Sequence, residues 1–186
     1  GLGDVYKRQI LLEAGTNELE VVEFYLDEAT FPTVDAGDVN ADPQAAAGEG
    51  SYRGYYGVNV AKVLEIIRMP KVTELPEVQH PSVLGAFNLR SRIIPLVDLA
   101  MWLGKTHTQT DEQPKTIVTE FNNVTTAFMV SGVNRIHRIS WEKVEQPNKY
   151  VAAVSNNTVI GVVKLEERIV FLLDLEKMVA NLNPKL

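Results

Sequence analysis

The sequence predicts an all-β protein made of two similar lobes, each of them a small β-barrel. Short segments rich in β-branched and aromatic residues recur between turn signals about every ten residues, which is typical of small barrels. In addition, Val83–Leu99 and Val159–Leu175 repeat one another at an offset of 76 residues without a gap, with 8 of 17 positions identical. A duplicated segment predicts that both lobes are built on the same hairpin.

The first strand is expected at Leu19–Leu26, where Val22, Phe24 and Leu26 share one face. Residues 29–54 contain glycines, prolines and polar residues, so we expect a loop inserted between the first two strands. The sheet is expected to resume at Tyr55–Val60. A helical turn around Ala61–Val63 and a strand at Leu64–Arg68 follow.

Each copy of the repeat is expected to form a strand, a tight turn, a strand and a helix. Asp98 and Asp174 stand where the helix N-caps belong. Thr116–Phe121 and Thr125–Val130 are two further strands, joined by a turn at Asn122 and Asn123, and we expect them to complete the second lobe.

The two copies of the repeat differ at the hairpin tip. The first copy has Asn88-Leu89-Arg90-Ser91 and the second has Lys164-Leu165-Glu166-Glu167, although the framework positions around them match. Two interpretations stay open: both tips are solvated turns whose residues vary freely, or one tip is a recognition site.

The composition excludes several classes of chemistry. The chain has 186 residues, no cysteine and a net charge of −6. Without cysteine there are no disulfides, thiolate nucleophiles or Cys-ligated clusters. Residues 27–50 hold six acidic residues and no Lys or Arg, so they account for the whole net charge. The acidic balance argues against general nucleic-acid binding, which needs a basic face, and no apolar run is long enough for a membrane span.

No motif predicts a metal site, a cofactor or an enzyme. His80, His107 and His137 have no second ligand at metal-binding spacing, and we expect them at the surface or hydrogen-bonded. The segment that starts at Asp38 and ends at Glu49 has the spacing of a calcium loop. However, Pro43 occupies the sixth position, where that loop needs glycine. A solvated acidic loop is therefore the favoured interpretation.

The first nine residues are interpreted separately. Residues 4–9 read DVYKRQ, which a common sequencing adapter encodes in one frame. We therefore interpret residues 1–9 as an adapter remnant and leave them out of the fold prediction.

Two further motifs, in order along the chain, are Tyr56–Ile66 (YGVNVAKVLEI) and Asn88–Leu99 (NLRSRIIPLVDL). They resemble the CheW-like domain of bacterial chemotaxis coupling proteins. Three other segments are Gly132–Trp141 (GVNRIHRISW), Gly161–Val170 (GVVKLEERIV) and the opening Leu11–Glu20. They resemble CheV, in which a CheW-like domain precedes a receiver domain. The resemblance assigns residues 10–184 to the CheW-like domain and 185–186 to the start of a linker, with the receiver absent from this chain.

The resemblance implies two five-stranded, SH3-like β-barrels with short helices and a groove between the barrels. It implies a cytoplasmic adaptor, without catalytic activity, that couples chemoreceptor hairpin tips to the regulatory domain of the histidine kinase CheA at membrane-associated arrays. The alternative is another SH3-like-barrel module that binds a peptide, RNA or a small ligand.

The family's site residues carry over position by position. The receptor-binding groove would comprise Val60, Val63, Glu65, Asn88 and Arg90, and Tyr150 would contact the kinase. Ordinary core packing remains open for the two valines, as does a solvated surface charge for Arg90. The chain has Ser91 where the family usually has glycine, so a turn residue with positive φ is less comfortable there.

Overall fold

The structure, a computed structural model, describes residues 17–29, 51–76, 80–105, 113–154 and 157–182. Several predictions concern residues outside this part. These residues are the adapter-like residues 1–9, residues 30–50 of the acidic segment with its calcium-like spacing, His107 and the residues after 182. Within the described residues, no helix is long and apolar enough to cross a lipid bilayer.

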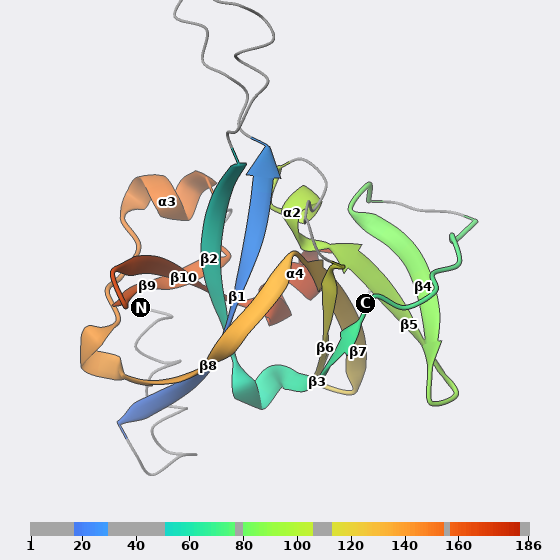
Figure 1. Ribbon diagram of the computed structural model, residues 1–186, viewed down its shortest axis with the longest axis horizontal. Coiled ribbons are helices and arrows are strands. Elements are labelled where there is room, and N and C mark those ends of the chain that lie inside the picture. Colours follow the sequence, from blue (N-terminus) through green and yellow to red (C-terminus); the bar gives the residue numbers. More distant parts are fainter. Residues whose placement is uncertain (1–16, 30–50, 77–79, 106–112, 155–156, 183–186) are drawn as a thin grey trace, which may run out of the picture.

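The described residues form ten strands in two five-stranded sheets (Figure 1). The terminal lobe has the strand order β8-β1-β2-β10-β9. Its strands are β1 (Glu18–Ala29), β2 (Ser51–Asn59), β8 (Gly132–Ser140), β9 (Val159–Leu165) and β10 (Arg168–Leu173). The central lobe has the order β3-β6-β7-β5-β4. Its strands are β3 (Val63–Arg68), β4 (Val83–Leu89), β5 (Arg92–Asp98), β6 (Lys115–Phe121) and β7 (Val124–Val130).

Short helices connect these strands. They are η1 (Val60–Lys62), α2 (Leu99–Trp102), η2 (Trp141–Lys143), α3 (Lys149–Val154) and α4 (Leu175–Leu182). The predicted all-β class, with two five-stranded lobes and short helices, is therefore confirmed. Strand structure also reaches both ends of the segment predicted as a loop, because β1 continues to Ala29 and β2 begins at Ser51.

The assignment of β6 and β7 to the second lobe was wrong. Both strands belong to the central lobe, together with the first copy of the repeat. The reason is that the second strand of each repeat hairpin pairs in parallel with a strand from another part of the chain. In the central lobe β5 pairs with β7, whereas in the terminal lobe β10 pairs with β2, which comes from the N-terminal part.

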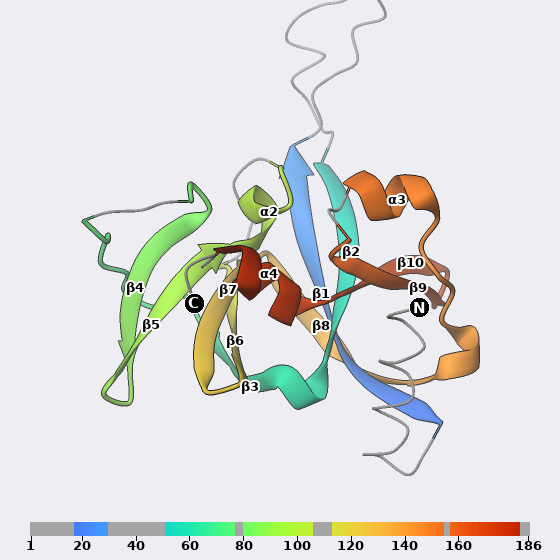
Figure 2. The same cartoon turned by 180° about the vertical axis from the view of Figure 1, so that it is seen from behind.

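The main hydrophobic core lies between the lobes. Val22, Phe24 and Leu26 are buried on one face of β1, as predicted, and belong to the same cluster as Phe128 of the central lobe and Met178 of α4. In Figure 2, α4 lies between the two lobes. A smaller apolar cluster fills each barrel. The two faces of β1 therefore serve different cores, one between the lobes and one inside the terminal barrel.

The predicted helix caps are confirmed. Asp98 Oδ1 accepts a hydrogen bond from the backbone N–H of Met101 at 3.3 Å, and Asp174 Oδ1 accepts one from that of Lys177 at 3.2 Å. A carboxylate at this position satisfies a backbone donor that has no partner within the helix. In each copy of the repeat, the equivalent aspartate thus ends the hairpin and caps the helix that follows.

The hairpin tips share one backbone conformation. Arg90 and Ser91 have φ values of 49° and 67°, and Glu166 and Glu167 have values of 48° and 67°. Two consecutive residues with positive φ match the two-residue turn that suits the twist of a hairpin. None of the four is glycine, so each adopts a conformation that a side chain disfavours.

The register of the sheets relates the remaining strands of the two lobes. In the terminal lobe, Leu172 pairs with Gly57, and Gly57 pairs with Glu23 on its other side. In the central lobe, Leu96 pairs with Ala127, and Ala127 pairs with Val118. Since Leu172 and Leu96 are matched by the repeat, Glu23 occupies the position that Val118 occupies in the other barrel.

The same reasoning relates the edge strands β8 and β3. The edge pairings are Val22 with Ile136 and Ile117 with Ile66. Arg135 and Glu65 each precede one of these isoleucines, so the two charged residues occupy equivalent positions. His137 and Ile67, which follow the isoleucines, are equivalent in the same way.

Candidate functional site

The tip of the β4–β5 hairpin lies next to β3. Arg90 Nη1 is 2.9 Å from Glu65 Oε2, and the side chain of Arg90 is 76% exposed. Because β3 and β4 are the opposite edges of the central sheet, this ion pair bridges the seam where the sheet closes on itself. Asn88 is exposed just before the tip. Three of the five predicted groove residues therefore lie around this seam.

Val60 and Val63 lie at the two ends of the turn that joins β2 to β3. Both are half-buried and pack against the core between the lobes. The Asn59 side chain caps the turn by accepting a hydrogen bond from Ala61 N at 2.9 Å. The two valines thus contribute to core packing while part of their surface stays exposed.

The turn η1 is also tied to α4. Lys62 Nζ is 2.6 Å from Glu176 Oε1. A small cavity of about 20 Å³ is lined by residues of β2 and η1, the end of β10, the capping Asp174 and the start of α4. Arg90 is not among its lining residues, so this hollow and the hairpin tip are separate features.

The outer face of β3 adds an apolar surface that the sequence analysis missed. Leu64 is 49% exposed and Ile66 is 41% exposed, while Val63 and Glu65 face the other way. Alternation along β3 places Leu64 and Ile66 on one face, but that this face is left uncovered follows only from how the sheet packs.

Tyr150, the predicted kinase contact, lies on α3. It is 76% exposed, and α3 packs against β9 of the terminal lobe. Figure 1 shows α3 and the β4–β5 hairpin on opposite sides of the molecule. The predicted receptor and kinase residues therefore lie on separate surfaces.

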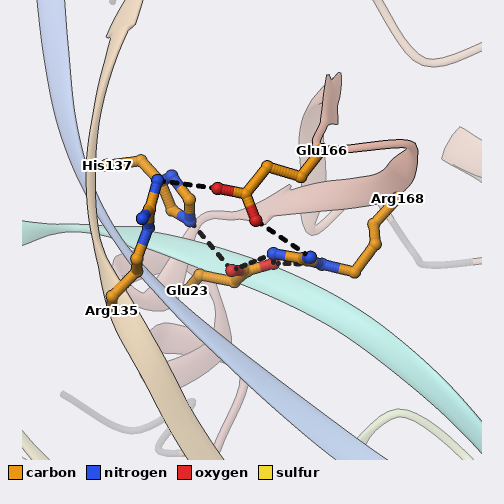
Figure 3. A network of polar contacts seen from close by, with 5 residues as sticks. All are labelled: Glu23, Arg135, His137, Glu166 and Arg168. Atoms are coloured by element: carbon orange, nitrogen blue, oxygen red, sulfur yellow. Dashed lines mark hydrogen bonds and ion pairs between the residues drawn. The ribbon is translucent and has the colours of Figure 1, made fainter.

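A network of charged residues in the terminal lobe was not predicted (Figure 3). Glu23 has no exposed surface and accepts three hydrogen bonds from Arg168, at 2.8, 3.0 and 3.1 Å. His137 Nε2 lies 2.8 Å from Glu23 Oε1. His137 is thus one of the hydrogen-bonded histidines that the sequence analysis expected. The sequence signal was weak, because one acidic residue in an apolar strand usually faces solvent.

The network changes the acidity of Glu23. Burial by itself raises the pKa of this carboxyl group, but hydrogen bonds from Arg168, His137 and Asn134 outweigh burial and hold the pKa below its ordinary value. The hydrogen bonds to Glu23 raise the pKa of Arg168. Glu23 and Arg168 therefore form a tightly held pair of opposite charges at neutral pH.

The hairpin tip of the terminal lobe extends this network. Glu166 Oε1 is 2.8 Å from Arg135 Nη2, and Glu166 Oε2 is 3.3 Å from Arg168 Nη1. In Figure 3 the Glu166 carboxylate lies between the two guanidinium groups. A cavity of about 340 Å³ opens beside these groups. Its lining residues are Glu23, Arg53, Tyr55, Asn134, Arg135, Glu166 and Arg168.

Comparisons with known proteins agree with this architecture. Residues 49–183 match the family model of the CheW-like domain. The chain is 44% identical to the chemotaxis protein CheV3 of Helicobacter pylori over 135 residues, which are 70% of this chain and 43% of that protein. It is 30% identical to CheV2 of the same organism over 144 residues, 70% of this chain and 45% of that protein. The chain thus spans less than half the length of these two relatives.

Shorter relatives and a solved structure extend the comparison. The chemotaxis protein CheW of Klebsiella aerogenes is 26% identical over 126 residues, 68% of this chain and 75% of that protein. The crystal structure of the scaffolding protein TtCheW from Thermoanaerobacter tengcongensis superposes with a TM-score of 0.65. That match covers 86% of this chain and 91% of that chain at 21% identity, and it confirms the fold.

Proposed function

The chain belongs to the family of CheW-like domains, and from that premise we propose that it is a chemotaxis adaptor that couples chemoreceptors to the histidine kinase CheA. In this role it works in the cytoplasm, at membrane-associated receptor arrays. It binds two partners and performs no chemical step. Each partner is proposed to bind a different lobe.

The observation that carries the receptor proposal is the Arg90–Glu65 pair at the seam of the central barrel. Arg90 presents a highly exposed guanidinium group, which has five donors in a planar fork suited to carboxylates and backbone carbonyls. Asn88 adds an exposed polar group beside it. Such a tip suits the polar end of a receptor hairpin.

Apolar surface is available near this tip. Val60 and Val63 are half-buried at the start of β3, and Leu64 and Ile66 are exposed on its outer face. An amphipathic receptor helix needs apolar contacts of this kind next to a charged anchor. We therefore propose that the receptor hairpin tip contacts the surface around η1, β3 and Arg90.

The kinase is proposed to bind the terminal lobe through α3. Tyr150 is largely exposed there, and exposed aromatic side chains are favoured at protein interfaces. Because α3 and the β4–β5 hairpin lie on opposite sides of the molecule, the chain can hold both partners at once (Figure 1).

A pull-down with a receptor cytoplasmic hairpin and CheA tests the proposal. We expect the wild-type chain to retain both partners together. Arg90→Glu should lose the receptor and keep the kinase, and Tyr150→Ala should do the reverse. Glu166→Arg is the matched control at the equivalent tip and should retain the receptor. If wild-type protein retains neither partner, the adaptor function is wrong.

A further inference from the structure

We propose that the open end of the terminal barrel is a binding site for a small oxyanion, a carboxylate or a phosphate. The cavity of about 340 Å³ is lined by three arginines from different strands, together with Tyr55 and Asn134. Arg53 comes from β2, Arg135 from β8 and Arg168 from β10. Planar guanidinium groups bind carboxylate and phosphate oxygens with paired hydrogen bonds.

The fold does not require this polar cluster. In the central barrel, Val118 occupies the position of Glu23, and Ile67 that of His137. Val118 is fully buried there, within the apolar interior of that barrel. A buried carboxylate with its cations is costly to desolvate, whereas apolar residues fill the same space at no such cost. The polar end of the terminal barrel is therefore an added feature, which calls for a function.

Glu23 fixes the position of Arg168. The repeat has arginine at this point in both copies, but the two arginines differ in their contacts. Arg92 extends along the surface to Thr125 and Glu120 and is 52% exposed. Arg168 turns toward the barrel, donates three hydrogen bonds to Glu23 and is 25% exposed. A guanidinium group held in this way is already oriented for a ligand at its outer side.

Glu166 occupies the position that the ligand would take. Its two oxygens contact Arg135 and Arg168 at the same time, as a bound carboxylate would. Its side chain is half-exposed and extends from a two-residue turn, so it can rotate into solvent without disturbing the sheet. We interpret Glu166 as an internal competitor, which an incoming anion displaces.

The balance of charges around the cavity indicates which class of ligand it binds. Arg53 is paired with Asp27 at 2.7 Å, and Glu23 compensates Arg168. When Glu166 turns away, Arg135 loses its described ion pair, and the site gains one uncompensated positive charge. A cavity at the small end of the range for ligand sites, with mainly charged walls, suits a small anion rather than a large apolar molecule.

Calorimetric titration of the full chain tests the proposal. The probes are citrate, succinate and inorganic phosphate, each at constant low ionic strength, because salt screens such contacts. We expect saturable binding with one site per chain, and the three probes separate a carboxylate from a phosphate preference. Arg135→Gln should weaken binding about tenfold. Glu166→Gln should tighten it several-fold, because the competing carboxylate is lost.

The central lobe supplies the control. Arg92→Gln removes the central-lobe counterpart of Arg168 and should leave anion affinity unchanged. All of these substitutions lie at the surface, and melting curves show that each variant is folded. Absence of saturable binding in both wild type and Glu166→Gln would overturn the proposal. So would equal losses from Arg135→Gln and Arg92→Gln, which would indicate diffuse attraction to the protein surface.

Discussion

The two lobes of the molecule share one hairpin frame and use it differently. Both tips have the same turn, and both place a charged residue against an edge strand. The charges are reversed: Arg90 faces Glu65 in the central lobe, and Glu166 faces Arg135 at the equivalent positions of the terminal lobe. The frame therefore accommodates an ion pair at this place with either sign of charge on the tip residue.

The comparison also separates framework from site within the barrels. Identical residues of the repeat, such as the capping aspartates, have the same role in both copies. The identical arginines do not, because Arg168 binds Glu23, whereas Arg92 contacts Thr125 and Glu120 and the position equivalent to Glu23 is Val118. The function of a repeated residue thus depends on the strand that the fold places beside it.

The largest expected effect is at Glu23. Glu23→Gln weakens a buried ion pair and leaves Arg168 without its full partner. We expect a loss of about 2–4 kcal/mol in the free energy of unfolding. Arg92→Gln, at the surface of the other lobe, should change it by no more than about 0.5 kcal/mol. Urea denaturation measures both, and similar losses would show that the buried Glu23–Arg168 pair contributes no more to stability than the surface contacts of Arg92.

The pH dependence of stability provides a second test of the role of Glu23. The pKa of Glu23 is lowered in the folded state, so its ionised form stabilises the fold fully above the ordinary value of 4.5. That contribution is lost as the pH falls through the folded-state pKa. The stability difference between wild type and Glu23→Gln should therefore shrink on acidification below pH 4.5.

Val118 provides the control for this experiment. Val118→Ala creates a cavity at the equivalent position of the central barrel without removing a titratable group. Its stability difference from wild type should stay constant over the same pH range. A parallel decline for both variants would mean that general acid unfolding, not Glu23, causes the effect.

A smaller effect is expected at the turns. Ser91 and Glu167 both have a φ of 67°, which glycine adopts without steric strain. Ser91→Gly and Glu167→Gly should each stabilise the protein by about 0.5–1 kcal/mol, the strain relieved minus the entropy cost of glycine. Thermal melting measures this. Opposite signs at the two tips would show that the turns are not equivalent in energy.

Much of the fold could be predicted from local sequence. The strands around Val22 and the helix caps at Asp98 and Asp174 follow from alternation and spacing over a few residues. The turn at Asn122 and Asn123 was predicted in the same way, and both residues have positive φ. These features depend on residues that are close together in the chain, so they can be predicted from a single sequence.

Features that depend on sheet order could not be predicted. The lobe of β6 and β7 depends on which distant strand pairs with each hairpin. The polar network joins Glu23 to Arg168, which lies 145 residues away in the chain. By contrast, the resemblance implied that both Glu65 and Arg90 belong to the groove, but it did not predict that they contact each other. The structure adds the ion pair between them.

The central claim is that the Arg90 tip recognises a receptor and does not merely close a barrel. The charge-swapped variant Arg90→Glu with Glu65→Arg tests it, because this pair reproduces the arrangement already present in the terminal lobe. Its free energy of unfolding should stay within about 0.5 kcal/mol of wild type.

Titration of this variant against a receptor cytoplasmic fragment is the decisive measurement. We predict that binding stays weaker than wild type by about 2–5 kcal/mol, as it is for Arg90→Glu alone, because the receptor meets the wrong charge. Recovery of wild-type affinity in the swapped variant would contradict the account, since the tip would then act only through its ion pair.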